Sequence, residues 1–254
     1  MKNGLYITLN FKKSLSFAVT LILIISLSLI LRYVGVFSDS VSATVDGLPV
    51  IIIDAGHGGE DGGTQSADGT LEKDINLSIS IYLDEILRER GFQTIMTRTG
   101  DYLIYDGELS AMRQKKVSDI HNRMKIVEEN GSCILISVHQ NYFRESKYSG
   151  TQVFYSKNNP DSKLLAEEIQ KSVVTALQPD NSRQIKESGT DIYLLYHSLV
   201  PSVMVECGFM SNEAEAEKLK DADYQRDMAQ AVADGLLNYI NINPEGETED
   251  GSEK

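Results

Sequence analysis

LPVIIIDAGHGG, residues 48–59, is the stretch of this 254-residue chain that decides its fold. Its first half is almost wholly apolar and β-branched, which is typical of a strand buried on both faces of a parallel sheet. Its second half, from Asp54 onward, holds one histidine among glycines, and glycines allow the backbone to turn sharply. The stretch therefore predicts a central parallel strand that ends in a loop carrying polar side chains.

Strand and helix patterns alternate along the rest of the chain. Further short apolar runs predict strands at 92–96, 133–138, 150–155, 191–195 and 202–207. Apolar residues at helical spacing, or charge-rich helical composition, predict helices at 72–90, 109–130, 161–177, 212–219 and 229–240. This alternation predicts an α/β fold with a mixed, mostly parallel sheet of about six strands, flanked by helices on both faces.

The composition divides the chain into four parts. Residues 1–34 carry basic residues and an uncharged run at 14–31, which predicts a cytoplasmic N-terminus followed by a transmembrane or signal-anchor segment. A cleaved signal peptide is the alternative, and both arrangements place the remaining chain outside the cytoplasm. Residues 35–47 form a polar linker, 48–242 a globular domain, and 243–254 an acidic tail that we expect to be disordered.

Charge and cysteine content exclude some classes of function. The formal net charge is −13, and a nucleic-acid-binding surface requires clustered Lys and Arg, so we expect no nucleic-acid partner. Cys133 and Cys207 lie in apolar runs, and we expect small buried core residues, although the sequence leaves open whether they pair. There is no Cys-x-x-Cys pair, so neither a thiolate zinc site nor a redox pair is indicated.

Four ionisable side chains interrupt or end apolar patterns. His57 follows the first strand, while His139 and Glu206 lie at the ends of two later ones. Glu72 falls on the apolar face of its helix, in the first turn. Each alone has an ordinary explanation, such as a loop histidine or an acid favoured at a helix N-terminus. Because ligands of open α/β sheets bind outside the carboxyl ends of the strands, however, all four side chains can share one site.

The same four side chains supply the parts of a catalytic zinc centre. Two imidazoles and one carboxylate form a common zinc shell that leaves a position for water. A second carboxylate outside the shell can take the proton of that water and pass it to a leaving amine. There is no Gly-x-Ser-x-Gly motif, and neither cysteine has a base beside it in sequence, which argues against a serine or cysteine nucleophile.

At these residues the sequence resembles the zinc-dependent N-acetylmuramoyl-L-alanine amidases (amidase type 3). The matching stretches between residues 50 and 241 are, in family order, IIIDAGHGGEDGG, LEKDINL, ISVHQN and PSVMVECGFMSN. The resemblance implies that His57, Glu72 and His139 bind one Zn²⁺ per chain. It implies that Glu206 is the catalytic acid and base. The implied reaction is hydrolysis of the amide bond between the lactyl group of muramic acid and L-alanine in peptidoglycan.

Three further stretches look like the germination-specific, spore-cortex subgroup, whose members remove stem peptides so that muramic δ-lactam can form. They are IMTRTGDYL, RQKKVSDIHNR and SGTQVFY. Some family members carry an inhibitory helix between the third ligand and the catalytic Glu, but the 66 residues between His139 and Glu206 show no spare helical pattern. Gln140 departs from the family, where a small or apolar residue is usual. We expect Gln140, Asn141 and His197 to contact substrate.

The sequence leaves two other functions open. A different zinc hydrolase of the cell wall, such as a peptidase or a sugar deacetylase, could use the same four side chains. A non-catalytic wall-binding protein could keep the same fold, although the presence of all four side chains disfavours it. The expected partners are peptidoglycan, the membrane through the N-terminal segment, and an unidentified accessory activator. The expected location is the cell wall or the spore intermembrane space, with the chain either membrane-anchored or secreted.

Overall fold

The computed structural model describes residues 47–242. The predicted membrane segment, nearly all of the linker and the acidic tail therefore lie outside the described residues. Within 47–242, every helix is either too short or too polar to span a bilayer.

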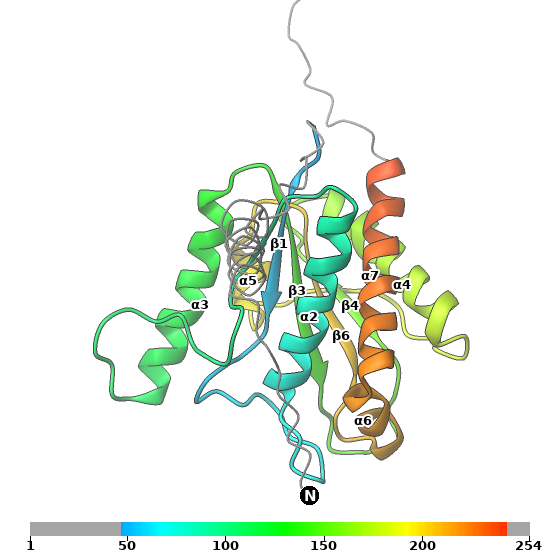
Figure 1. The fold of residues 1–254 in the computed structure, drawn as a ribbon, viewed down its shortest axis with the longest axis horizontal. Coiled ribbons are helices and arrows are strands. Elements are labelled where there is room, and N and C mark those ends of the chain that lie inside the picture. Colours follow the sequence, from blue (N-terminus) through cyan, green and yellow to red (C-terminus); the bar gives the residue numbers. More distant parts are fainter. Residues whose placement is uncertain (1–46, 243–254) are drawn as a thin grey trace, which may run out of the picture. The chain divides into compact units, whose positions relative to one another are not determined.

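A six-stranded sheet forms the centre of the described chain (Figure 1). Its strands are β1 (Val50–Ala55), β2 (Thr94–Met96), β3 (Cys133–Asn141), β4 (Gln152–Tyr155), β5 (Lys186–Glu187) and β6 (Ser202–Phe209). They lie in the order β2-β1-β3-β6-β4-β5. All neighbouring strands are parallel except β4 and β6, which are antiparallel. The predicted mixed, mostly parallel sheet is therefore confirmed.

Helices cover both faces of this sheet (Figure 1). One face carries α2 (Glu72–Glu89), α4 (Asp161–Leu177) and α7 (Ala222–Ile242), with α7 packed against both α2 and α4. The other face carries α3 (Met112–Glu129) and α5 (Tyr193–His197). The short helix α6 (Glu213–Lys220) contacts α7 and β6. This arrangement confirms the predicted α/β fold with helices on both sides.

Burial of strand β1 on both faces of the sheet explains why the first half of residues 48–59 is apolar. Ile51 and Ile53 join the core beneath α2, α4 and α7, whereas Ile52 joins the core beneath α3 and α5. All three side chains are fully buried, and burial of each stabilises the fold by about 1.5–3 kcal/mol. The strand therefore tolerates no polar residue until Asp54, close to its carboxyl end.

The sequence prediction was wrong for one strand. Residues 191–195 were expected to form a strand, but the helical turn α5 occupies 193–197. The strand that was not predicted is β5, which has two residues. Leu194 and Leu195 are both buried, so the run does not alternate, and a short apolar run does not distinguish a strand from a helical turn. Strand β5 is Lys-Glu, exposed at the sheet edge, and so has no apolar signal.

The other elements agree with their predictions to within a few residues, except that α7 begins seven residues earlier, at 222 rather than 229. The Asn212 side chain caps α6 by accepting from the Glu215 backbone N–H at 3.2 Å, as its position predicts. Gly91 has φ +87° and follows α2, as expected of a helix-ending glycine. Cys133 and Cys207 are both free and buried, which confirms their expected place in the core.

Candidate active site

His57 lies in the loop that follows β1, at the carboxyl edge of the sheet. Its φ is +62°, a left-handed conformation that is costly for a residue other than glycine. Two buried arginines hold this backbone in place. Arg123 donates to the carbonyls of Ala55 at 2.7 Å and His57 at 2.6 Å. Arg98 donates to the carbonyls of Ala55 at 2.8 Å and Gly56 at 3.0 Å.

The charge of Arg123 is balanced by two buried acids. Its Nη1 lies 2.7 Å from Asp54 Oδ1, and its Nε lies 2.7 Å from Asp119 Oδ2. Thr97 and Ser137 also donate hydrogen bonds to the Asp54 carboxylate. Burial alone would raise the pKa of Asp54, but Arg123 and the other hydrogen bonds outweigh it and lower the pKa to about 2. Arg123, Asp54 and Asp119 beneath the His57 loop are thus paired with one another, while Arg98 is satisfied by backbone carbonyls.

Three of the predicted site residues come together directly above this network. The Glu72 carboxylate, at the start of α2, has Oε1 3.2 Å from His57 Nε2 and 3.0 Å from His139 Nδ1. One donor atom from each residue lies within 4.8 Å of the others. Tetrahedral ligands about 2.0–2.1 Å from a zinc ion lie roughly 3.3 Å apart. The cluster of His57, Glu72 and His139 therefore fits a bound metal ion.

Glu72 is buried and its charge is well supported. Its Oε2 accepts from the Thr64 backbone N–H at 2.8 Å, and its Oε1 accepts from the Gln140 backbone N–H at 3.1 Å. Burial raises its pKa, but hydrogen bonds from His139 and His57 outweigh this and hold the pKa far below the ordinary value. The carboxylate is thus ionised, as a metal ligand must be.

Asp61 orients His57 from the opposite side of the ring. Its Oδ2 lies 2.9 Å from His57 Nδ1, and its Oδ1 lies 2.8 Å from Lys116 Nζ. Burial lowers the pKa of His57, but the hydrogen bonds to Asp61 and Glu72 outweigh it and raise the pKa to about 9. A carboxylate that accepts from one imidazole nitrogen directs the other nitrogen to a metal.

Asp61 was not among the residues predicted from the sequence. The available signal was an acid four residues after the loop histidine, in the glycine-rich run GHGGEDGG.

Glu206 lies beside His139, because the two residues are register partners on β6 and β3. Its Oε2 is buried and has no hydrogen-bond partner among residues 47–242. Burial raises the pKa of Glu206 to about 7, although the neighbouring histidines act in the opposite direction. An acid with a pKa near neutrality can both accept and donate a proton during a reaction.

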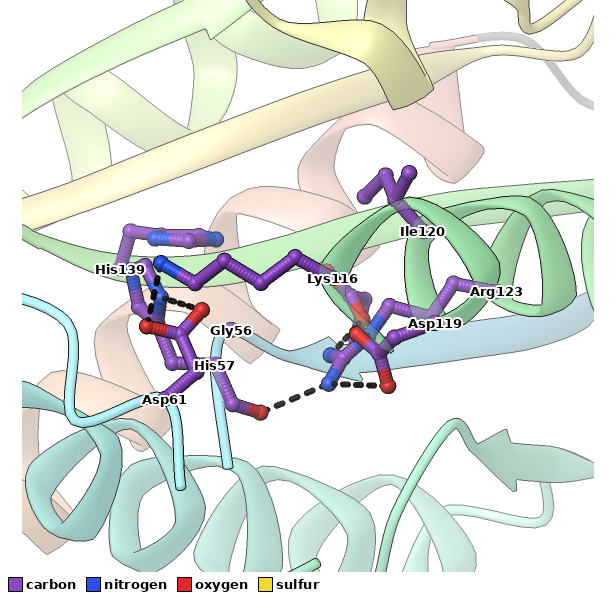
Figure 2. Close-up of a pocket in the computed structure, with 9 residues that line it drawn as sticks. Gly56, His57, Asp61, Lys116, Asp119, Ile120, Arg123 and His139 are labelled. Atoms are coloured by element: carbon purple, nitrogen blue, oxygen red, sulfur yellow. Dashed lines mark hydrogen bonds and ion pairs between the residues drawn. The ribbon is translucent and has the colours of Figure 1, made fainter. Parts of the chain in front are cut away.

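A cavity of about 170 Å³ opens between the His57 loop and α3. Figure 2 shows Lys116 reaching from α3 over Asp61, with His139 close by. The residues that line the cavity are Asp54, Gly56, His57, Asp61, Lys116, Asp119, Ile120, Arg123 and His139. Gly56 must be glycine, because a Cβ there would lie 2.2 Å from His139 Nε2.

The three residues expected to contact substrate lie in different settings. Gln140 is buried and donates through Nε2 to Asn76 Oδ1 at 3.1 Å, so it supports the Glu72 side of the cluster. Asn141 is half-buried at the end of β3. His197 lies on α5, where its ring packs 4.2 Å from that of Tyr193, and no contact joins it to the metal cluster in the described chain. Substrate contact by these residues stays a prediction.

Comparison with known proteins places this site in a family. The family model for N-acetylmuramoyl-L-alanine amidases matches residues 51–238, about three quarters of the chain. The germination-specific N-acetylmuramoyl-L-alanine amidase of Bacillus subtilis is 31% identical over 191 residues, which cover 75% of this chain and 79% of that protein.

Two solved structures share the fold. The CwlD amidase of Clostridioides difficile, solved in complex with the GerS lipoprotein, is 40% identical with a TM-score of 0.74; the match covers 77% of this chain and 100% of that one. The amidase AmiC2 of Nostoc punctiforme is 29% identical with a TM-score of 0.65, covering 76% and 97%. The chain therefore belongs to the N-acetylmuramoyl-L-alanine amidase family and is an enzyme of that class.

Proposed function

We propose that this amidase hydrolyses the bond between the lactyl group of muramic acid and L-alanine with one zinc ion, which His57, Glu72 and His139 would hold. One observation carries the proposal: three donor atoms lie within 4.8 Å of one another, beside the half-buried Glu206, whose Oε2 is buried and has no hydrogen bond in residues 47–242. Two imidazoles and a carboxylate leave a zinc ion with an open position for water or substrate.

When bound, zinc would polarise the scissile carbonyl and lower the pKa of water towards about 7. Proton transfer falls to Glu206, which accepts a proton from the attacking water and delivers it to the L-alanine nitrogen as the C–N bond breaks. The new C–O bond leaves the lactyl group as a carboxylate and the peptide as an amine. The pKa of about 7 suits Glu206 to both transfers. Asp61 keeps the His57 ring in the orientation that the metal requires.

The test is digestion of purified peptidoglycan followed by mass spectrometry. We expect intact stem peptides with a free L-alanine amino end, no products after chelation, and full recovery when zinc is returned. Glu206→Gln protein serves as the folded, inactive control. Cleavage inside the stem peptide or release of acetate would instead indicate a different zinc hydrolase. Binding to the wall without new amino ends would indicate a non-catalytic protein.

We further propose that the substrate is spore-cortex peptidoglycan, as a step towards muramic δ-lactam. The support is similarity to the germination-specific enzyme of Bacillus subtilis and to the CwlD structure. Deletion of the gene should remove muramic δ-lactam from muropeptide digests of spores. Normal δ-lactam in the deletion strain would contradict this assignment.

We also propose that the domain acts outside the cytoplasm and that residues 14–31 deliver it there. A protein partner is part of the proposal, because the CwlD relative was solved with a lipoprotein bound. The intact mass of the protein recovered from membranes would decide between an uncleaved anchor and a cleaved signal peptide.

A further inference from the structure

A row of side chains leads away from the candidate metal cluster across the sheet. His139 on β3 is the register partner of Glu206 on β6, and Glu206 is in turn the partner of Gln152 on β4. Register partners on neighbouring strands point to the same face of a sheet and lie about 5 Å apart. The row therefore continues past Glu206 towards the outer edge formed by β4 and β5.

Arg183 stands at the end of this row, in the segment between α4 and β5. Its Nη2 donates to Gln152 Oε1 at 2.6 Å, and its guanidinium lies 4.8 Å from the centre of the Phe209 ring. Its backbone N–H donates to Asn181 Oδ1 at 2.9 Å, and Asn181 Nδ2 donates to the Thr151 carbonyl at 2.9 Å. Arg183 is thus held in place by the Phe209 ring against its guanidinium, by the hydrogen bond to Gln152 and by its backbone N–H.

Arg183 keeps hydrogen-bonding capacity that nothing in the described chain uses. Its Nε is buried and has no hydrogen-bond partner among residues 47–242, and its charge acts on the nearby Glu206 and Glu215 carboxylates only through space. The two other arginines near the site differ, since Arg98 and Arg123 donate to several acceptors each. A buried donor without a partner costs free energy that a ligand can recover, and a guanidinium fork matches a carboxylate in particular.

The proposed reaction determines which part of the substrate lies along the row. Glu206 must reach the L-alanine nitrogen, so the leaving peptide lies on the Glu206 side of the metal cluster. An extended peptide advances about 3.3–3.6 Å per residue. Gln152 is one strand spacing of about 5 Å beyond Glu206, and Arg183 contacts Gln152 directly. This spacing would bring the residue that follows L-alanine within reach of Arg183.

We propose that Arg183 binds a free carboxylate on the stem-peptide residue that follows L-alanine, and so makes the enzyme prefer the acidic form of the peptide over the amidated form. This inference rests on the proposed function. Arg183 is a specificity-determining residue in this scheme, since the bond-breaking steps do not require it.

The test compares two muramoyl peptides that differ only at this second residue, which carries either a carboxylate or a carboxamide. For the zinc-loaded wild-type enzyme we expect kcat/KM to be about 10- to 100-fold higher for the carboxylate, the range given by a charged hydrogen-bonded pair. Arg183→Met should abolish the preference by lowering kcat/KM for the carboxylate substrate alone. Arg183→Lys should restore part of it.

Two further variants separate recognition from a structural role. Gln152→Glu keeps Arg183 and its packing but places a carboxylate against the guanidinium, so it should also abolish the preference. Lys186→Met removes another cation from the same edge, one that stacks on Phe154 at 5.6 Å, and should leave the preference intact. Thermal unfolding and zinc content of each variant should match the wild type.

The possible failures are distinguishable. Equal turnover of the two substrates by the wild type would overturn this inference and leave the proposed function standing. So would an Arg183→Met variant that loses activity equally on both substrates. Release of peptide from neither substrate by the zinc-loaded wild type would overturn the proposed function, and this inference with it.

Discussion

Two groups of buried charge lie next to each other at the carboxyl edge of the sheet, and they differ in how fully they are paired. In the group around Asp54, the carboxylate meets Arg123, Thr97 and Ser137. In the group around Glu206, one carboxylate oxygen is buried without a hydrogen bond in the described chain. Buried polar groups are nearly always satisfied, and the exceptions need an explanation. The group around Asp54 explains how the His57 loop is held in its conformation. The group around Glu206 explains how the site can carry out proton transfer.

The pKa values express the same difference. Pairing lowers the pKa of Asp54 to about 2, so its charge is permanent at neutral pH. Burial raises the pKa of Glu206 to about 7, so its charge can change during turnover. Groups with perturbed pKa values occur both in ion-pair networks and in active sites. The direction of the shift, together with the missing hydrogen bond, distinguishes the two groups here.

The largest expected effect is a loss of activity, and it tests the group around Glu206. Glu206→Gln keeps the shape of the side chain but cannot exchange a proton, so activity should fall by about 10³-fold. Zinc content should stay at one per chain, because Glu206 is not one of the three clustered donors. Release of new amino groups from peptidoglycan and elemental analysis measure the two quantities. More than a tenth of the wild-type activity would remove Glu206 from its proposed role.

The next effect tests the fully paired group. Arg123→Met leaves two buried carboxylates, Asp54 and Asp119, without their cation. It should lower the free energy of unfolding by about 3–5 kcal/mol. Urea unfolding of the zinc-free protein measures this cost. Arg113→Met is the matched control, since Arg113 lies exposed on the same helix, and it should change stability by less than about 0.5 kcal/mol. A loss below about 1 kcal/mol for Arg123→Met would mean that the network contributes little.

Acid should weaken the same group. The pKa of Asp54 is about 2 in the folded chain, below the unfolded value of about 3.9. A depressed pKa contributes stability that is present above pH 4 and is lost as the pH falls towards 2. Its size is about 2.5 kcal/mol. Unfolding of the zinc-free protein between pH 5 and pH 2 should show this loss in the wild type and lack it in Asp54→Asn. Parallel curves for the two proteins would contradict the assignment.

The two groups also differ in how far the sequence could predict them. His57, Glu72, His139 and Glu206 each interrupt or end an apolar pattern, so their positions at strand ends and on a buried helix face were visible. The topology then placed them together, because parallel strands end at one edge. In the paired group only Asp54 offered such a signal, because it ends the first apolar run. Arg123 lies 69 residues from Asp54 on a charge-rich helix, where nothing distinguishes a buried arginine from an exposed one.

Residues that act through another residue could not be predicted either, because contacts between residues far apart in sequence leave no pattern. Arg183 meets the row of site residues through Gln152, 31 positions away in sequence, and no periodicity indicates such a contact. Strand β5 was missed because its two residues are charged and exposed. Apolar patterns identify elements that the core buries, whereas these features depend on contacts that only the folded chain creates.

The smallest expected effect is a loss of zinc affinity. It tests the loop that carries His57 and Asp61 and joins the two groups. Asp61→Asn removes the charge beside His57 Nδ1 and keeps the size of the side chain, so zinc affinity should fall about tenfold. Competition with a chromogenic chelator measures the affinity directly, and excess zinc should restore most of the activity. Asp68→Asn is the control, because Asp68 belongs to the same loop region but pairs with Lys220 instead. If both variants lost affinity equally, general loosening of the loop would explain the result; loss in Asp61→Asn alone requires that the metal site depends on its carboxylate neighbour.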